Sequence, residues 1–111
     1  MEAPRFACGL SLEKESSAAI RGALAELEAE LDGATPDLVL AFATHHHGPA
    51  LEDLGPRLAR TTGARMVAGC TAESVIGGSR EVEGRPGLSL WAAQLPGTEV
   101  RYFEVDAIQG P

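Results

Sequence analysis

The side chains that could carry chemistry gather at the ends of apolar segments. A thiol, a hydroxyl and a carboxylate follow the apolar run at residues 66–69, and three consecutive histidines follow the run at residues 38–44. A second thiol and a serine lie in the first apolar segment, at residues 6–11. Such groups act as nucleophiles, bases or metal ligands in enzymes, and as hydrogen-bonding partners in ligand sites. The residues concerned are Cys8, Ser11, Thr44, His45, His46, His47, Cys70, Thr71 and Glu73.

Cys70 is the candidate nucleophile of an enzyme. A helical turn predicted over residues 71–76 would place free backbone N–H groups beside its sulfur, where they would stabilise a thiolate. A thiol mechanism also needs a base fixed near the sulfur, and no spacing in the sequence provides one. Free cysteine often packs as a small apolar residue instead. We therefore expect no enzyme, and a thiol- or metal-dependent hydrolase that uses Cys70 with residues His45 to His47 is the alternative.

The histidine run raises the question of a metal site, because imidazole is the commonest transition-metal ligand in proteins. In an extended segment His45 and His47 point to one side and His46 to the other, so one ion does not easily bind all three. No zinc-type spacing pairs the run with Cys8 or Cys70. We expect no metal and no other cofactor, so that the histidines contact a ligand or lie in a solvated loop.

Two helices and three strands are predicted to position these groups. Apolar residues at steps of three and four mark a helix that begins at Ser16 or Ser17 and ends at Asp32. A second helix near residues 49–62 is expected to kink or divide at Gly55-Pro56, because a proline inside a helix removes a hydrogen bond. The predicted strands of this half cover residues 5–10, 37–44 and 66–69.

The second half of the chain changes character. Turn sequences at residues 84–87 and 95–98 separate strand-like segments, and such short connections join antiparallel neighbours. The continuous apolar character of residues 38–44 favours a central parallel strand with helices on both sides. The predicted class is α/β, with a β-α-β-α-β parallel core followed by an antiparallel β-meander, in a mixed sheet flanked by helices and within one domain over residues 1–111. The meander strands are predicted at residues 80–83, 88–94 and 99–105.

Composition restricts the partners of the chain. Sixteen acidic and nine basic side chains among 111 residues give a formal charge of -7, which repels nucleic acid and anionic lipid surfaces. No window approaches the roughly 20 apolar residues that span a bilayer, and the first residues lack a signal-peptide pattern. We expect a cytoplasmic protein with no nucleic-acid or membrane partner. Its two cysteines are predicted to be free thiols, with one bridge between Cys8 and Cys70 as the arithmetic alternative.

Four segments together resemble the amino-terminal part of the FIST domain, a family named for F-box and intracellular signal transduction proteins. Their order and spacing match over about residues 6–105. The most telling piece is the Gly-Cys-Thr turn at residues 69–71, which is followed by glycines and an apolar strand. The four segments are residues 8–11, 37–46, 67–77 and 88–92.

The resemblance implies a sensory domain of intracellular signal transduction that binds small ligands such as amino acids. Members usually carry the rest of an amino-terminal half and a separate carboxyl-terminal half. We therefore expect residues 1–111 to be the amino-terminal portion of a FIST N domain. Its expected partners are a small-molecule ligand and either the carboxyl-terminal part of the domain or a signalling module.

The position of the ligand site is predicted from the sheet. Ligands of open α/β sheets usually bind beyond the carboxyl ends of the strands. There the N–H groups of Thr71 and Ala72 would hold a carboxylate, while Glu73 or a histidine would meet an amino group. An interaction or dimerisation module is a further alternative, marked by an exposed apolar sheet edge or face, and homo-oligomerisation is left open. The predicted ligand-binding residues are Cys8, Gly9, Ser11, Thr44, His45, His46, Gly69, Cys70, Thr71 and Glu73.

Overall fold

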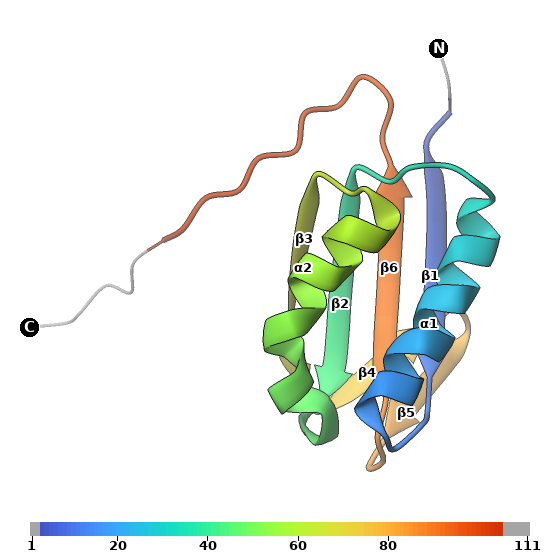
Figure 1. The fold of residues 1–111 in the computed structure, drawn as a ribbon, viewed down its shortest axis with the longest axis vertical. Coiled ribbons are helices and arrows are strands. Elements are labelled where there is room, and N and C mark those ends of the chain that lie inside the picture. The colour runs from blue at the N-terminus through green and yellow to red at the C-terminus, as the bar shows by residue number, and fades with distance from the viewer. Residues whose placement is uncertain (1–2, 106–111) are drawn as a thin grey trace, which may run out of the picture.

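In the computed structural model, which describes residues 3–105, two α-helices cover one face of a four-stranded mixed sheet (Figure 1). The predicted α/β class with a mixed sheet and helices is confirmed. A two-stranded antiparallel hairpin lies outside this sheet. In chain order the elements are β1 (Arg5–Ser11), α1 (Ser16–Leu31), β2 (Leu38–Thr44), the 3-10 helix η1 (His45–Ala50), α2 (Leu51–Thr62), β3 (Met66–Ala72), β4 (Ser74–Gly77), β5 (Arg80–Glu83) and β6 (Leu88–Gln94).

The strand order in the main sheet is β1-β6-β2-β3. Strand β6 is antiparallel to both β1 and β2, and β2 is parallel to β3. Strands β1, β2 and β3 therefore run in one direction, as the predicted parallel core requires, but β6 lies between the first two. The antiparallel strands do not form a simple meander, because β5 pairs with β4 while β6 enters the main sheet.

The main core lies between the sheet and the two helices. Successive strand residues face opposite sides, and the residues that face the helices are small or branched and almost fully buried. The other face has a smaller core in which the hairpin residues Val75 and Val82 pack on Leu10. The prediction of helices on both sides of residues 38–44 is wrong, because this hairpin takes the place of a helix. The sheet residues of the main core are Ala7, Val39, Ala41, Ala43, Leu88, Leu90 and Ala92.

Helix α1 follows its predicted apolar stripe, with Ile20, Leu24 and Leu27 buried against the sheet. Its amino-terminal cap is Glu15 rather than Ser16 or Ser17, since the Glu15 carboxylate accepts hydrogen bonds from backbone N–H groups of the first turn. The helix ends at Asp32, which adopts a left-handed conformation with φ 47°. The acidic side chains of its outer face remain exposed.

Two local predictions of the carboxyl half are wrong. The helical turn expected over residues 71–76 is an extended segment that ends in β4, where Val75 is buried against the second core. Residues 99–105 are not a strand, and they extend away from the body of the domain (Figure 1). The interruption expected at Gly55-Pro56 does not divide α2, which continues past Pro56 to Thr62.

Candidate functional site

Strands β1, β2 and β3 end at the same edge of the sheet, drawn at the bottom of Figure 1. Ser11 and Thr44 are the last residues of β1 and β2, and β3 ends one residue before Glu73. Ser11, Thr44 and Glu73 therefore lie at this edge, as the strand argument predicted. The 3-10 helix η1 starts directly after Thr44 and carries all three histidines.

Thr44 forms the centre of a buried hydrogen-bond network at this edge. Its backbone N–H donates to the carbonyl of Gly87 at 2.9 Å, and the N–H of Gly87 donates to the Thr44 hydroxyl at 3.0 Å. The same hydroxyl lies 2.9 Å from Nδ1 of His46. Thr44 is only 1% exposed. It therefore ties the end of β2 to the start of β6 and orients His46, while its hydroxyl has no free surface for a ligand.

The three histidines have different surroundings. His45 and His46 are exposed, and their rings stack with centroids 4.1 Å apart. His47 is 2% exposed, and its Nδ1 lies 2.8 Å from the Ser16 hydroxyl at the start of α1. Within residues 3–105, Nε2 of His47 is the one buried side-chain nitrogen or oxygen without a hydrogen-bond partner. The run thus offers two imidazoles to solvent and uses the third to join η1 to α1.

Desolvation and the charges of its neighbours favour the neutral form of His46. Partial desolvation lowers the pKa of His46 below its ordinary value, and the neighbouring His45 and His47 lower it further. Thr44 has one hydroxyl proton, and His46 Nδ1 is a closer acceptor for it than the Gly87 carbonyl at 3.4 Å. When the hydroxyl donates to Nδ1, the proton of the neutral ring is on Nε2, which then donates outward.

Strand β3 brings a second group of predicted residues to this edge. Gly69, Cys70 and Thr71 are exposed, and Glu73 is exposed directly after the strand. A Cβ atom added at Gly48 of η1 would lie 3.6 Å from the Thr71 methyl group, so Thr71 and the histidine segment are neighbours. No helix follows Cys70, and the backbone N–H groups predicted to hold a carboxylate belong to a strand.

Cys8 and Gly9 lie in the middle of β1, away from the strand ends. A Cβ at Gly9 would overlap the backbone carbonyl of Ala23 and lie 3.1 Å from the Leu27 nitrogen, so Gly9 is a packing position beneath α1. The Cys8 thiol lies 3.7 Å from a carboxylate oxygen of Glu30. Burial raises the pKa of the Cys8 thiol above its ordinary value, and the negative charge of Glu30 raises it further.

The two thiols do not form a disulfide. Cys8 and Cys70 are both free, and β6 and β2 lie between their strands. Three strand spacings amount to roughly 14 Å, and a disulfide requires Cα atoms within about 7 Å of each other. The prediction of two free thiols is confirmed, and the arithmetic alternative of a bridge is wrong.

An apolar groove between α2 and β3 was not predicted from the sequence. It has a volume of about 100 Å³, and two glycines, Gly55 and Gly69, lie on its opposite walls. The other lining residues are Ala41, Leu51, Leu54, Leu58, Val67 and Ala68. The leucines of α2 predicted the helix. The groove beside them exists because β3 is the edge strand of the sheet, which the sequence pattern does not show.

Residues 3–105 hold no group of three or more His, Cys, Asp or Glu side chains that could bind a metal ion together. Within the same residues, no hydrogen bond links Cys70 to a histidine. None of the described helices is long and apolar enough to cross a membrane.

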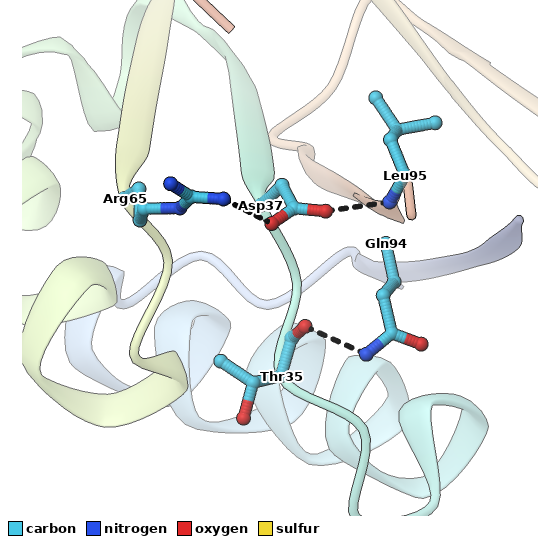
Figure 2. Close-up of polar contacts among 5 residues, drawn as sticks. All are labelled: Thr35, Asp37, Arg65, Gln94 and Leu95. Atoms are coloured by element: carbon cyan, nitrogen blue, oxygen red, sulfur yellow. Dashed lines mark hydrogen bonds and ion pairs between the residues drawn. The ribbon is translucent and has the colours of Figure 1, made fainter. Parts of the chain in front are cut away.

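A polar clamp holds the opposite end of the sheet (Figure 2). The Asp37 carboxylate accepts a hydrogen bond from the backbone N–H of Leu95 at 2.6 Å and contacts the Arg65 guanidinium at 3.4 Å. Gln94 donates from its side chain to the carbonyl of Thr35 at 3.2 Å. The clamp joins the start of β2 to the end of β6 and to the residue before β3. It lies at the end of the sheet away from the histidines.

The fold and the strand-end cluster define an α/β domain with exposed imidazole, hydroxyl and carboxylate groups at one edge of its sheet. A family model described as FIST N domain matches residues 37–108 of this chain. The chain therefore belongs to the FIST N domain family.

Two proteins of Mycobacterium tuberculosis are similar to this chain over almost its whole length. They are the uncharacterized protein MT0656 of strain CDC 1551 / Oshkosh and the uncharacterized protein Rv0628c of strain ATCC 25618 / H37Rv. Each is 27% identical over 105 residues, which cover 95% of this chain. The chain spans only 27% of the length of these relatives. No solved structure matches the chain significantly.

Proposed function

We propose that this FIST N domain is a small-ligand-binding sensory domain and has no catalytic role. The ligand, an amino acid or a related polar metabolite, binds at the carboxyl ends of β2 and β3. The site is formed by the exposed imidazoles of His45 and His46, the hydroxyl of Thr71 and the carboxylate of Glu73. Thr44 acts behind them as a positioning residue. Output passes to a signalling module that is joined to the domain or bound by it.

The observation that supports this site best is the Thr44–His46 contact at 2.9 Å. A buried threonine that is itself fixed by Gly87 holds an exposed imidazole in one orientation at the strand-end edge. Such pre-organisation reduces the ordering cost of binding. A solvated loop histidine would not require a buried partner, and ligands of open α/β sheets bind at this kind of edge.

The polar groups of the site complement an amino acid. With its Nδ1 occupied by Thr44, neutral His46 presents an Nε2–H donor, which suits a ligand carboxylate. Glu73 carries the opposite kind of group, an acceptor for an ammonium. The Thr71 hydroxyl adjoins η1 and can donate or accept. The site therefore favours a ligand with both a carboxylate and an amino group.

A thermal-shift screen with free amino acids tests this function, because a ligand at a hundred times its Kd adds about 2.7 kcal/mol of stability. We expect one or more amino acids to raise the melting midpoint. Thr71→Val and His46→Ala should reduce the shift, whereas Thr98→Val, an exposed threonine near the other end of the sheet, should leave it unchanged. A shift that survives both site variants, or none with any amino acid, would contradict the proposal.

One observation favours a second function, that of an interaction module. The sheet face opposite the helices is covered by the β4-β5 hairpin only near Leu10 and Phe42. Elsewhere on this face Phe6 is 57% exposed and stacks on Trp91, with ring centroids 5.8 Å apart. Exposed apolar surface of this kind marks interaction sites on soluble proteins.

A further inference from the structure

Strand β3 is an open edge of the main sheet. Among the residues that the structure describes, 3–105, it pairs only with β2, and its residues 68–71 are exposed. Natural edge strands are usually protected by charged side chains, proline, a bulge or a covering element. The sequence of β3, Met-Val-Ala-Gly-Cys-Thr-Ala, has no charged residue and no proline. Its outward backbone N–H and C=O groups are thus free to pair with another strand.

Both flanks of β3 can accept the side chains of an added strand. On the helix side, the apolar groove against α2 has no side chain at Gly55 or Gly69 to fill it. On the other side, Ala68 and Cys70 are exposed and small. An added strand would place alternate side chains on these two flanks.

The chain carries a segment suited to this edge. Residues 99–105, Glu-Val-Arg-Tyr-Phe-Glu-Val, are rich in strand-forming residues and have as many residues as β3. Tyr102, Phe103 and Val105 are 66%, 78% and 79% exposed. In Figure 1 the segment leaves the end of β6 and extends away from the body on the side of β3. Within residues 3–105 the chain therefore has both an unpaired strand edge without charges and an unpaired segment with exposed apolar side chains.

We propose that residues 99–105 of one copy pair antiparallel with β3 of a second copy, and that two copies exchange these segments in a symmetric dimer. In the proposed register Glu99 lies opposite Ala72 and Val105 lies opposite Met66. The exchange closes the edge on both copies, as a two-fold interface allows. The dimer shares the Thr71 end of β3 with the proposed ligand site, because Val100 would lie opposite Thr71, but it requires no ligand and none of its contacts involve the histidines.

Charge complementarity favours the second copy over the segment of the same chain. The open edge has Arg65 before it and Glu73 after it. In the proposed antiparallel register Glu104 lies opposite Val67, on the same face as Arg65 and diagonal to it. Strand β6 is antiparallel to β2, and β2 is parallel to β3, so β6 runs opposite to β3. If the chain reversed after β6, its own residues 99–105 would therefore run parallel to β3. In that direction Glu104 would approach Glu73, which is unfavourable.

Sedimentation equilibrium of the full chain without ligand tests the dimer. We expect Phe103→Asp and Ala68→Lys each to raise the dimer Kd at least about tenfold, the effect of losing a central apolar contact. Ile76→Asp is the matched control, because Ile76 is a comparably exposed apolar residue, 65%, that lies on the separate hairpin. A chain that remains monomeric, or a dimer that persists in both variants, would overturn the proposal.

Disulfide trapping in the Cys8→Ser background tests the direction of pairing. Antiparallel pairing places residue 101 opposite Cys70, so Arg101→Cys should give a disulfide-linked dimer on non-reducing gels. Pairing of the chain's own segment parallel to β3 would instead place residue 103 opposite Cys70. An intrachain disulfide in Phe103→Cys, without a linked dimer in Arg101→Cys, would overturn the exchange between copies. These outcomes leave the thermal-shift test of ligand binding unaffected.

Discussion

The carboxylate of Asp37 accepts a hydrogen bond from the backbone N–H of Leu95, 58 residues later in the chain, at 2.6 Å (Figure 2). The backbone N–H of Asp37 also donates to the carbonyl of Ala93 at 2.8 Å. These two bonds fix the end of β6 beside the start of β2. They also fix the point from which residues 99–105 leave the domain, so the same clamp that orders the sheet sets the origin of the exposed segment.

Removal of the Asp37 carboxylate should destabilise the domain. Asp37→Ala leaves the partly buried N–H of Leu95 without its charged acceptor, which costs about 1 to 3 kcal/mol. Urea denaturation followed by circular dichroism measures the loss. Arg65→Ala is the matched control, because the Arg65 side chain is 78% exposed and such surface pairs contribute about 0 to 1 kcal/mol. Equal losses in the two variants would show that the ion pair, and not the Leu95 bond, carries the stability.

Close packing of α1 on β1 depends on Gly9. Gly9→Ala would press a methyl group into the backbone of Ala23, and overpacking of this kind costs about 1 to 3 kcal/mol. Gly22 is an exposed residue of α1, and a Cβ there would meet only the Ser11 side chain at 3.5 Å. Gly22→Ala should therefore stabilise the domain by about 1 kcal/mol, because alanine favours the helix more than glycine does. Thermal melts of the two variants should therefore shift in opposite directions. A shift of the same sign in both would contradict the packing argument.

The two thiols should react at different rates. Cys8 is half-buried beside Glu30, and its raised pKa reduces the thiolate that attacks alkylating reagents. Cys70 is exposed on the edge strand. Mass spectrometry after timed alkylation should find Cys70 labelled first, and Glu30→Gln should accelerate labelling of Cys8. Unchanged labelling in that variant would show that the Glu30 charge does not control the thiol.

The cap of α1 should make stability depend on acid pH. The hydrogen bond from the Ser17 hydroxyl is the main cause that lowers the pKa of Glu15 in the folded state, and the bond from the Ala18 N–H lowers it further. The stabilisation is therefore complete above the unfolded pKa of about 4.3 and is lost as pH falls through the lower folded value. Melting curves should show Glu15→Gln less stable than the parent at pH 7, with the difference disappearing toward pH 3. A difference that stays constant with pH would contradict an ionised cap.

The local pattern predicted the elements of the first half well. The apolar stripe of Ile20, Leu24 and Leu27 marked α1, and the apolar runs marked β2 and β3. The position of β6 between β1 and β2 could not be predicted this way, because it depends on pairing between residues far apart in the sequence. The helical turn predicted over residues 71–76 is instead extended and leads into β4, where Val75 and Ile76 are β-branched and Val75 packs on Leu10.

The candidate site was predicted only in part for the same reason. The strand-end rule placed Thr44, His46 and Thr71 at one edge, where they lie. It could not show that Gly87 would occupy the Thr44 hydroxyl, because 43 residues separate the two. It also predicted Gly9 as a ligand-binding position. The structure places the close backbone contact at Gly9, since only the register of β1 beneath the helix decides which glycine is covered.

The protonation of His46 should report on the strand-end site directly. Desolvation first, and then the charges of His45 and His47, lower its pKa, so the ring is neutral at pH 7 and protonates below the ordinary value of about 6.5. The folded pKa of His46 is lower than the unfolded pKa of about 6.5, so His46 has no effect on stability above about pH 6.5. Stability is lost as pH falls from there through the folded pKa. NMR titration of the ring carbons measures this pKa, and His45→Ala should raise it by removing a stacked positive neighbour. A pKa at or above the ordinary value, or one that His45→Ala does not raise, would contradict this account and remove the neutral Nε2–H donor from the proposed site.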